Sequence, residues 1–188
     1  MYMFKIILNN NKSLEINNVL LKEDYGGYET WEAIVADICE VFNMSEEIEF
    51  IIMGFGQDKW PVDCMYDLLC VAENLPKIIM GFSENIFNFE LDFYEQGLER
   101  KLTFKDKGTF IEIFCKSRTK WNPEPMFECT SKKELVEMIL KLYRNFIFYS
   151  QYLCKNLLEN PLMDKFILED TITKKVKTSF GVSLNPLE

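Results

Sequence analysis

The sequence predicts an α+β fold, in which an antiparallel β-sheet, made of an N-terminal hairpin and a central meander, packs against an N-terminal helix and a long C-terminal helix. Three patterns support this: apolar and polar residues alternate over 87–94, and apolar residues recur every three or four positions after Thr30 and after Ser131. With 188 residues, 48% of them hydrophobic, the chain suits one domain. We expect this domain to span residues 1–170, with 171–188 forming a C-terminal tail or an added edge strand.

The N-terminal part predicts a strand pair followed by an amphipathic helix. Residues 3–8 and 14–21 form the expected hairpin, joined by the turn sequence NNNKS. Thr30 is suited to cap the helix that follows. The apolar stripe of this helix consists of Trp31, Ile34, Val35, Ile38 and Phe42. The opposite side projects carboxylates toward water, those of Glu29, Glu32, Asp37 and Glu40.

Three shorter elements are expected before the meander. Residues 47–55 are typical of a strand that ends in glycine. Residues 64–75 predict a short helix, which Pro76 would close. The apolar run IIMGF at 78–82 is interpreted as a buried strand.

The meander begins with the segment 87–94, whose alternation places apolar side chains on one sheet face and Glu90 and Asp92 on the other. Two turn sequences, EQG at 95–97 and KDKG at 105–108, join it to two further strands. The last of these, TFIEIFC, is apolar on both sides except at Glu112, as expected of a more central strand.

The strongest helical signal lies in the C-terminal part. Ser131 and Glu134 have the spacing of a capping box. Apolar residues then recur at helical spacing as far as Leu157, a distance of about seven turns, and Pro161 ends the pattern. Such a helix needs a broad apolar surface, which we expect the meander to supply.

Acidic residues are concentrated in the first half of the chain. Residues 1–100 contain 19 acidic and 6 basic side chains, a net charge of −13, whereas residues 101–188 have a net charge of +4. The window from Glu23 to Asp58 contains ten carboxylates and no Lys or Arg. This charge is either a solvated surface or a negative field that attracts a basic partner.

Composition excludes several classes of function. The net charge of −9 argues against a nucleic-acid partner and against binding to an anionic membrane. Without any histidine, the chain has no Ser-His-Asp triad, no Cys-His pair and no His-based zinc site. The six cysteines lack CxxC spacing, and the N-terminus does not read as a signal peptide. We expect mostly buried, reduced thiols in a cytoplasmic protein that has neither a metal nor a cofactor.

Candidate chemical sites are weak. Glu90 and Asp92 share one strand face, so a carboxylate pair of the glycosidase kind is conceivable, but nothing nearby marks a sugar-binding cleft. The sequence GFGQDKW lacks the spacing of a phosphate-binding loop. Trp60 and Trp121 lie beside proline-containing loops, either at the edge of the core or as exposed anchors for a partner. Three basic residues flank this region, Arg100, Arg118 and Lys120.

Three segments resemble small bacterial immunity proteins of polymorphic-toxin and contact-dependent growth inhibition systems: DYGGYETWEAIVADICEVF, FELDFYEQGLERKLTF and CKSRTKWNP. The resemblance covers roughly residues 14–160. It implies a cytosolic protein without enzymatic activity that binds the C-terminal domain of one cognate toxin, often a basic nuclease. The expected partner-binding residues are Glu29, Glu32, Asp37, Glu40, Glu90 and Asp92. The alternatives are an acidic mimic of DNA that inhibits a nucleic-acid enzyme and a carboxylate- or metal-dependent hydrolase.

Overall fold

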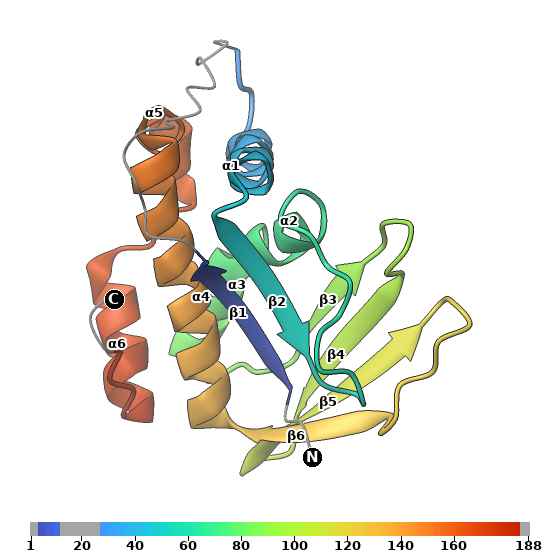
Figure 1. Ribbon diagram of the computed structural model, residues 1–188. Helices are drawn as coiled ribbons and strands as arrows, with labels where there is room; N and C mark the ends of the chain where they lie inside the picture. Colours follow the sequence, from blue (N-terminus) through green and yellow to red (C-terminus); the bar gives the residue numbers. More distant parts are fainter. Residues whose placement is uncertain (1–3, 12–26, 185–188) are drawn as a thin grey trace.

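The computed structural model describes residues 4–11 and 27–184, and its architecture is α+β, as the sequence predicts. The strands form two separate antiparallel sheets instead of the single sheet expected (Figure 1). The smaller sheet pairs β1 (Lys5–Asn10) with β2 (Ile48–Met53). The larger sheet has the order β3-β4-β5-β6, with strands β3 (Phe89–Phe93), β4 (Arg100–Asp106), β5 (Phe110–Ser117) and β6 (Phe127–Ser131).

Helices cover the sheets from the top and from one side in the view of Figure 1, where α1 lies above the strands, α4 lies beside β1, and α6 lies on the outer side of α4. The helices are α1 (Trp31–Ser45), α2 (Asp67–Ala72), α3 (Leu75–Ser83), α4 (Lys132–Leu153), α5 (Lys155–Leu158) and α6 (Asp170–Phe180), with a 3₁₀ turn η2 (Pro161–Lys165). One continuous cluster of buried apolar residues joins the two sheets to these helices.

The N-terminal predictions are confirmed where the structure describes them. The Thr30 hydroxyl accepts a hydrogen bond from the Ala33 backbone nitrogen at 3.4 Å, so this residue caps α1. The predicted apolar stripe of α1 is buried at Ile34, Val35, Ile38 and Phe42. The predicted strand partner of residues 3–8, the segment 14–21, lies outside the described residues, and β1 pairs with β2.

The meander is also confirmed. Leu91 and Phe93 of β3 are fully buried, which leaves Glu90 and Asp92 on the outer face. The sequence did not reveal β6, whose residue Phe127 lies opposite Phe114 of β5. Because β6 follows a polar loop and leads at once into α4, its five residues carry too little alternation to be distinguished from loop.

The interpretation of residues 78–82 as a strand is wrong, because this run belongs to helix α3. Pro76 lies in the first turn of that helix, where its missing N–H has no helical partner to lose, so it helps to begin α3 and does not merely close α2. Ile78, Ile79 and Phe82 are buried on one side of α3. A short apolar run does not by itself distinguish a buried strand from a buried helix.

The C-terminal helix begins as predicted and ends earlier. The backbone nitrogen of Glu134 donates to the Ser131 hydroxyl at 3.1 Å, and the Ser131 nitrogen donates to the Glu134 carboxylate at 3.0 Å, so the capping box forms. Helix α4 stops at Leu153 because Cys154 leaves the helical conformation, with φ −149° and ψ 53°. The apolar residues beyond it continue in α5.

Helix α4 packs along β1 and also contacts β5 and β6, whereas α2 packs against β3. The Asn145 side chain of α4 donates to the Leu8 backbone oxygen at 2.8 Å. The expectation that the meander supplies the surface for the long helix is therefore confirmed only in part. The smaller sheet supplies the main surface for this helix.

The predicted tail or edge strand at 171–188 is instead helical over most of its described length. Helix α6 packs on α3 and α4, and it buries Val176. It ends at Gly181, whose φ of 59° is the left-handed conformation that glycine adopts without strain. The sequence did not predict this helix because its few apolar residues give a weak helical periodicity. Its stability depends on packing against α3 and α4.

The buried carboxylate of Glu128 joins the two sheets. From β6 it accepts a hydrogen bond from the Phe4 backbone nitrogen at 2.5 Å and a second from the Phe55 backbone nitrogen. Phe4 immediately precedes β1, and Phe55 follows β2 after Gly54. Two backbone donors that the small sheet leaves unpaired are thus satisfied by the large one.

Candidate functional site

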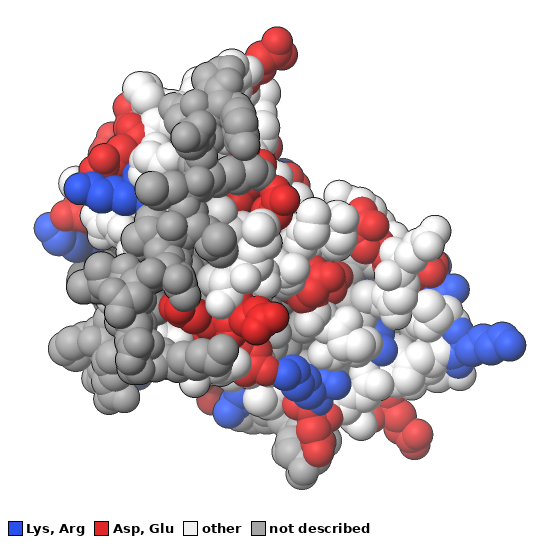
Figure 2. Space-filling model, turned by 45° about the horizontal axis from the view of Figure 1, so that its top comes forward, with Lys and Arg blue, Asp and Glu red and all other residues white. Residues whose placement is uncertain are grey.

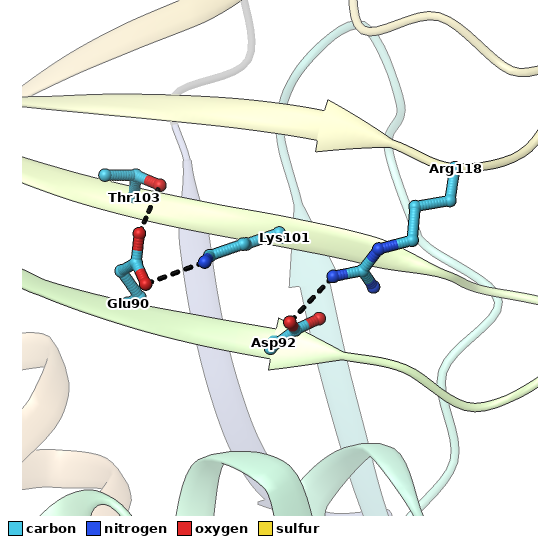
Figure 3. Close-up of polar contacts among 5 residues, drawn as sticks. All are labelled: Glu90, Asp92, Lys101, Thr103 and Arg118. Atoms are coloured by element: carbon cyan, nitrogen blue, oxygen red, sulfur yellow. Dashed lines mark hydrogen bonds and ion pairs between the residues drawn. The ribbon is translucent and has the colours of Figure 1, made fainter.

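The carboxylates of Glu90 and Asp92 lie on the outer face of β3, as predicted, and each is paired with a cation (Figure 3). An oxygen of Glu90 lies 2.7 Å from the Lys101 ammonium, and the Thr103 hydroxyl donates to the other oxygen at 3.3 Å. Asp92 accepts from the Arg118 guanidinium at 2.7 Å. The Lys101 ammonium lowers the pKa of Glu90 below its usual value. These two predicted site residues are thus neutralised locally.

The outer face of the larger sheet carries charges of both signs. Glu112 pairs with Lys107 at 3.1 Å. Lys105 and Lys116 are exposed on β4 and β5. This face therefore does not produce the strong negative field that the charge distribution along the sequence predicts.

An apolar strip on the same sheet face was not predicted from the sequence. Phe110, Met126 and Phe127 are exposed, Met126 at 70% of its surface, and the Phe114 and Phe127 rings lie 5.7 Å apart. The Lys105 ammonium lies 4.8 Å from the centre of the Phe114 ring. The predicted central strand, β5, is covered by the core on one face only, which leaves its other apolar residues at the surface.

The four predicted carboxylates of the N-terminal helix lie on or beside α1. Glu29 precedes the helix and is exposed, whereas Glu32, Asp37 and Glu40 are half-buried. The Tyr28 hydroxyl donates a hydrogen bond to Asp37. In the part of the chain that the structure describes, neither Glu29 nor Glu32 forms an ion pair.

A groove of about 830 Å³ connects the start of α1 with the start of β3. Figure 2 shows Asp and Glu side chains spread over the middle of one molecular face, with Lys and Arg mostly toward its margin. Burial, and then the charge of Glu32, raise the pKa of Glu73 in the groove. The groove thus brings Glu90 close to the acidic region of α1. Its lining includes Trp31, Glu73, Lys77, Met80, Glu84, Ile86 and Glu90.

The two tryptophans near proline-containing loops contact each other edge to face, and a buried arginine packs against both rings. Trp60 has no exposed surface and Trp121 is half-buried. The Arg100 guanidinium carbon lies 4.4 Å from the Trp60 ring centre and 3.5 Å from that of Trp121, and the side chain is only 4% exposed. Arg100 also donates to the Gln57 side-chain oxygen at 2.7 Å. Trp60 is thus a core residue, and Arg100 is not a surface cation.

A buried carboxylate, Asp67, lies near this cluster at the start of α2. One of its oxygens accepts a hydrogen bond from the Asp63 backbone nitrogen at 3.0 Å, and the other has no hydrogen-bond partner. Burial raises the pKa of Asp67 to about 6, an effect that the nearby Arg100 opposes. Asp67 therefore keeps its proton up to a higher pH than an exposed aspartate does.

The cysteines are distributed as the sequence predicts. Five of the six are buried, Cys129 is exposed, and none forms a disulfide. Burial raises the pKa of Cys64, Cys70, Cys115 and Cys154 to about 12, so these thiols are held in the protonated form. No group of three or more Cys, Asp or Glu side chains within residues 4–11 and 27–184 is arranged to hold a metal ion.

No family model, no curated protein and no solved structure matches this chain. The resemblance to immunity proteins therefore rests only on the three sequence segments quoted above. None of the described helices has both the length and the apolar composition that crossing a bilayer requires. The acidic groove beside α1 is the candidate site because it combines concave shape, exposed apolar side chains and two carboxylates, Glu73 and Glu84, that form no ion pair within the described residues.

Proposed function

We propose that the protein is a non-enzymatic inhibitor that binds and neutralises a basic toxin domain, in the manner of bacterial immunity proteins. One observation supports this above all. Glu29, Glu32 and Glu73 have no ion-pair partner among the described residues, whereas Glu90 and Asp92 on the sheet are paired. Of the two predicted interfaces, the helix side is therefore the one that keeps its charge for a partner.

A surface with unpaired carboxylates can recognise a basic toxin domain through charge complementarity. A toxin that acts on nucleic acid needs cationic side chains to bind phosphates. An inhibitor with unpaired carboxylates attracts that surface over long range, which raises the association rate and disfavours acidic competitors. Burial raises the pKa of Glu73, and repulsion from the charge of Glu32 adds to this effect. A cation from the partner relieves that repulsion on binding.

The direct test is co-expression with the toxin domain encoded by the neighbouring gene. We expect the chain to restore growth and to co-purify with the toxin domain at equal stoichiometry. A chain that neither binds the toxin domain nor restores growth overturns the proposal. Competition with duplex DNA for several unrelated DNA-binding proteins would instead support an acidic mimic of DNA.

Charge reversal locates the interface. We expect the double variant Glu29→Lys, Glu32→Lys to associate with the toxin domain at least about tenfold more slowly, with a flatter dependence on salt. The matched control is Glu137→Lys together with Asp164→Lys, because these residues are exposed on α4 and η2 and form no ion pair in the described structure. Stopped-flow kinetics at several ionic strengths measures both. Equal effects of the two double variants would place the interface away from α1.

A further inference from the structure

We propose that the groove between α3 and the start of β3 receives an extended segment of the partner that carries Lys or Arg side chains. The inference rests on the proposed function and deepens it, because it assigns the acidic side a specific pocket and a specific form of ligand. The groove is the larger of two hollows that meet at Asn88, Phe89 and Glu90, the second having a volume of about 450 Å³. Together they form a continuous path along the start of β3.

The edge of β3 is open along this path. Within the described residues, β3 pairs with β4 only, so its second edge has no strand partner. Helix α2 packs against β3, and its residue Cys70 lies near the backbone of Tyr94, just beyond the far end of the strand. The accessible part of the edge is therefore its beginning, where an extended segment can lie alongside.

The wall of the groove opposite β3 is held in place before any partner arrives. At the end of α3, the backbone nitrogens of Glu84 and Ile86 donate to the Gly81 oxygen at 3.0 Å and 2.8 Å. A side chain at position 81 would lie 3.3 Å from the Ile86 backbone oxygen, so the chain folds back closely here. A preformed wall reduces the entropy that binding must overcome.

The chemistry of the lining indicates a basic and partly apolar ligand. Glu73 and Glu84 form no ion pair in the described structure, and Lys77 is the single cation of the lining. Met80 and Ile86, which line the same groove, are 48% and 51% exposed. An extended ligand with both basic and apolar side chains can therefore place cations at the carboxylates and apolar groups on Met80 and Ile86.

The probe for this inference is a short fluorescent peptide of alternating Lys and Val, with a peptide of alternating Glu and Val as its opposite. Fluorescence anisotropy should show binding of the Lys-Val peptide only. The double variant Glu73→Gln, Glu84→Gln should bind it about threefold to tenfold more weakly. Met80→Arg should also weaken it, because the new cation occupies the carboxylates. The control is Glu46→Gln with Glu137→Gln, two exposed carboxylates outside the groove lining.

Amide chemical shifts place the peptide independently of affinity. We expect the chemical-shift changes at residues 80–90. Changes confined to other segments would overturn the inference. Equal peptide affinities of the groove variants and the control variants would overturn it as well. Failure of the proposed function is separate, because it is measured with the toxin domain. If the peptide binds and the toxin domain does not, the proposed function is refuted and the peptide-binding role of the groove stands. If the toxin domain binds and the groove variants do not weaken that binding, the role of the groove is refuted and the proposed function stands.

Discussion

Replacing Glu128 by alanine is the most direct test of how the two sheets are joined. The Glu128 side chain leaves β6 and accepts two backbone hydrogen bonds, from Phe4 before β1 and from Phe55 after β2. The side chain is buried, so water does not replace it freely. Its removal therefore leaves two donors of the small sheet without an acceptor.

The magnitude follows from those two donors. A buried donor left unsatisfied costs about 1–3 kcal/mol, and more where the lost partner is charged. Two of them predict that Glu128→Ala lowers the free energy of unfolding by about 2–6 kcal/mol. Glu128→Gln keeps one side-chain oxygen as an acceptor and presents an amide donor to the other N–H, so we expect about half of that loss.

Urea denaturation followed by circular dichroism measures the effect. The midpoint should fall strongly for Glu128→Ala and less for Glu128→Gln, without a change in slope if unfolding remains two-state. Glu137→Ala is the control, because that carboxylate is exposed on α4. A loss below about 1 kcal/mol in Glu128→Ala, or one equal to that of the control, would refute the reasoning.

Four further results are expected. Gly54→Ala should lower the midpoint of unfolding well below that of Gly97→Ala, because both residues have positive φ but only at Gly54 would the new Cβ lie 3.1 Å from Glu128 and from Phe4; similar midpoints would contradict this. Arg100→Lys should change tryptophan fluorescence and cost about 1–3 kcal/mol, since a lysine lacks the planar guanidinium that packs against the Trp60 and Trp121 rings; an unchanged emission spectrum would contradict this contact. Because burial raises the pKa of Asp67 to about 6, the folded protein holds a proton that the unfolded chain releases between about pH 4 and pH 6, and stability from this group falls as the pH rises through that window. Asp67→Asn should therefore stabilise the protein by on the order of 2–3 kcal/mol at neutral pH and hardly at pH 4, as thermal melts at both values would show. A thiol reagent should modify one cysteine quickly in the native protein, Cys129, and all six after unfolding; fast reaction of several native thiols would contradict the burial of the others.

Elements with strong local signals were predictable. The N-cap of α1, the capping box of α4 and the alternation of β3 each depend on residues that lie close together in the chain. Elements that depend on tertiary contacts were not predictable from the sequence. The run at 78–82 becomes part of a helix, and 170–180 becomes α6, because each is buried against segments that are distant in sequence.

The candidate site divides in the same way. The sequence placed Glu29, Glu32, Asp37 and Glu40 on the outer side of one helix and Glu90 and Asp92 on the outer face of a strand. The structure agrees for the strand, whereas Glu29 precedes α1 and the other three helix residues are half-buried. The sequence did not show that Lys101 and Arg118 neutralise the second set, because those ion pairs join residues across strands and loops. The sequence also did not single out Glu73 and Glu84, because the groove that they line exists only after α3 packs beside β3.

The sequence by itself determined the fold class, the position of the acidic residues along the chain and the absence of histidine chemistry, because these depend on composition and local periodicity. Only the tertiary structure decided which carboxylates keep an unpaired charge and which apolar side chains stay exposed. The physical reason is that an ion pair or a burial depends on which distant segment lies opposite. For Glu90 that segment is β4, with its lysine. For Glu73 no cation lies opposite in the described structure, so its charge is available to a binding partner.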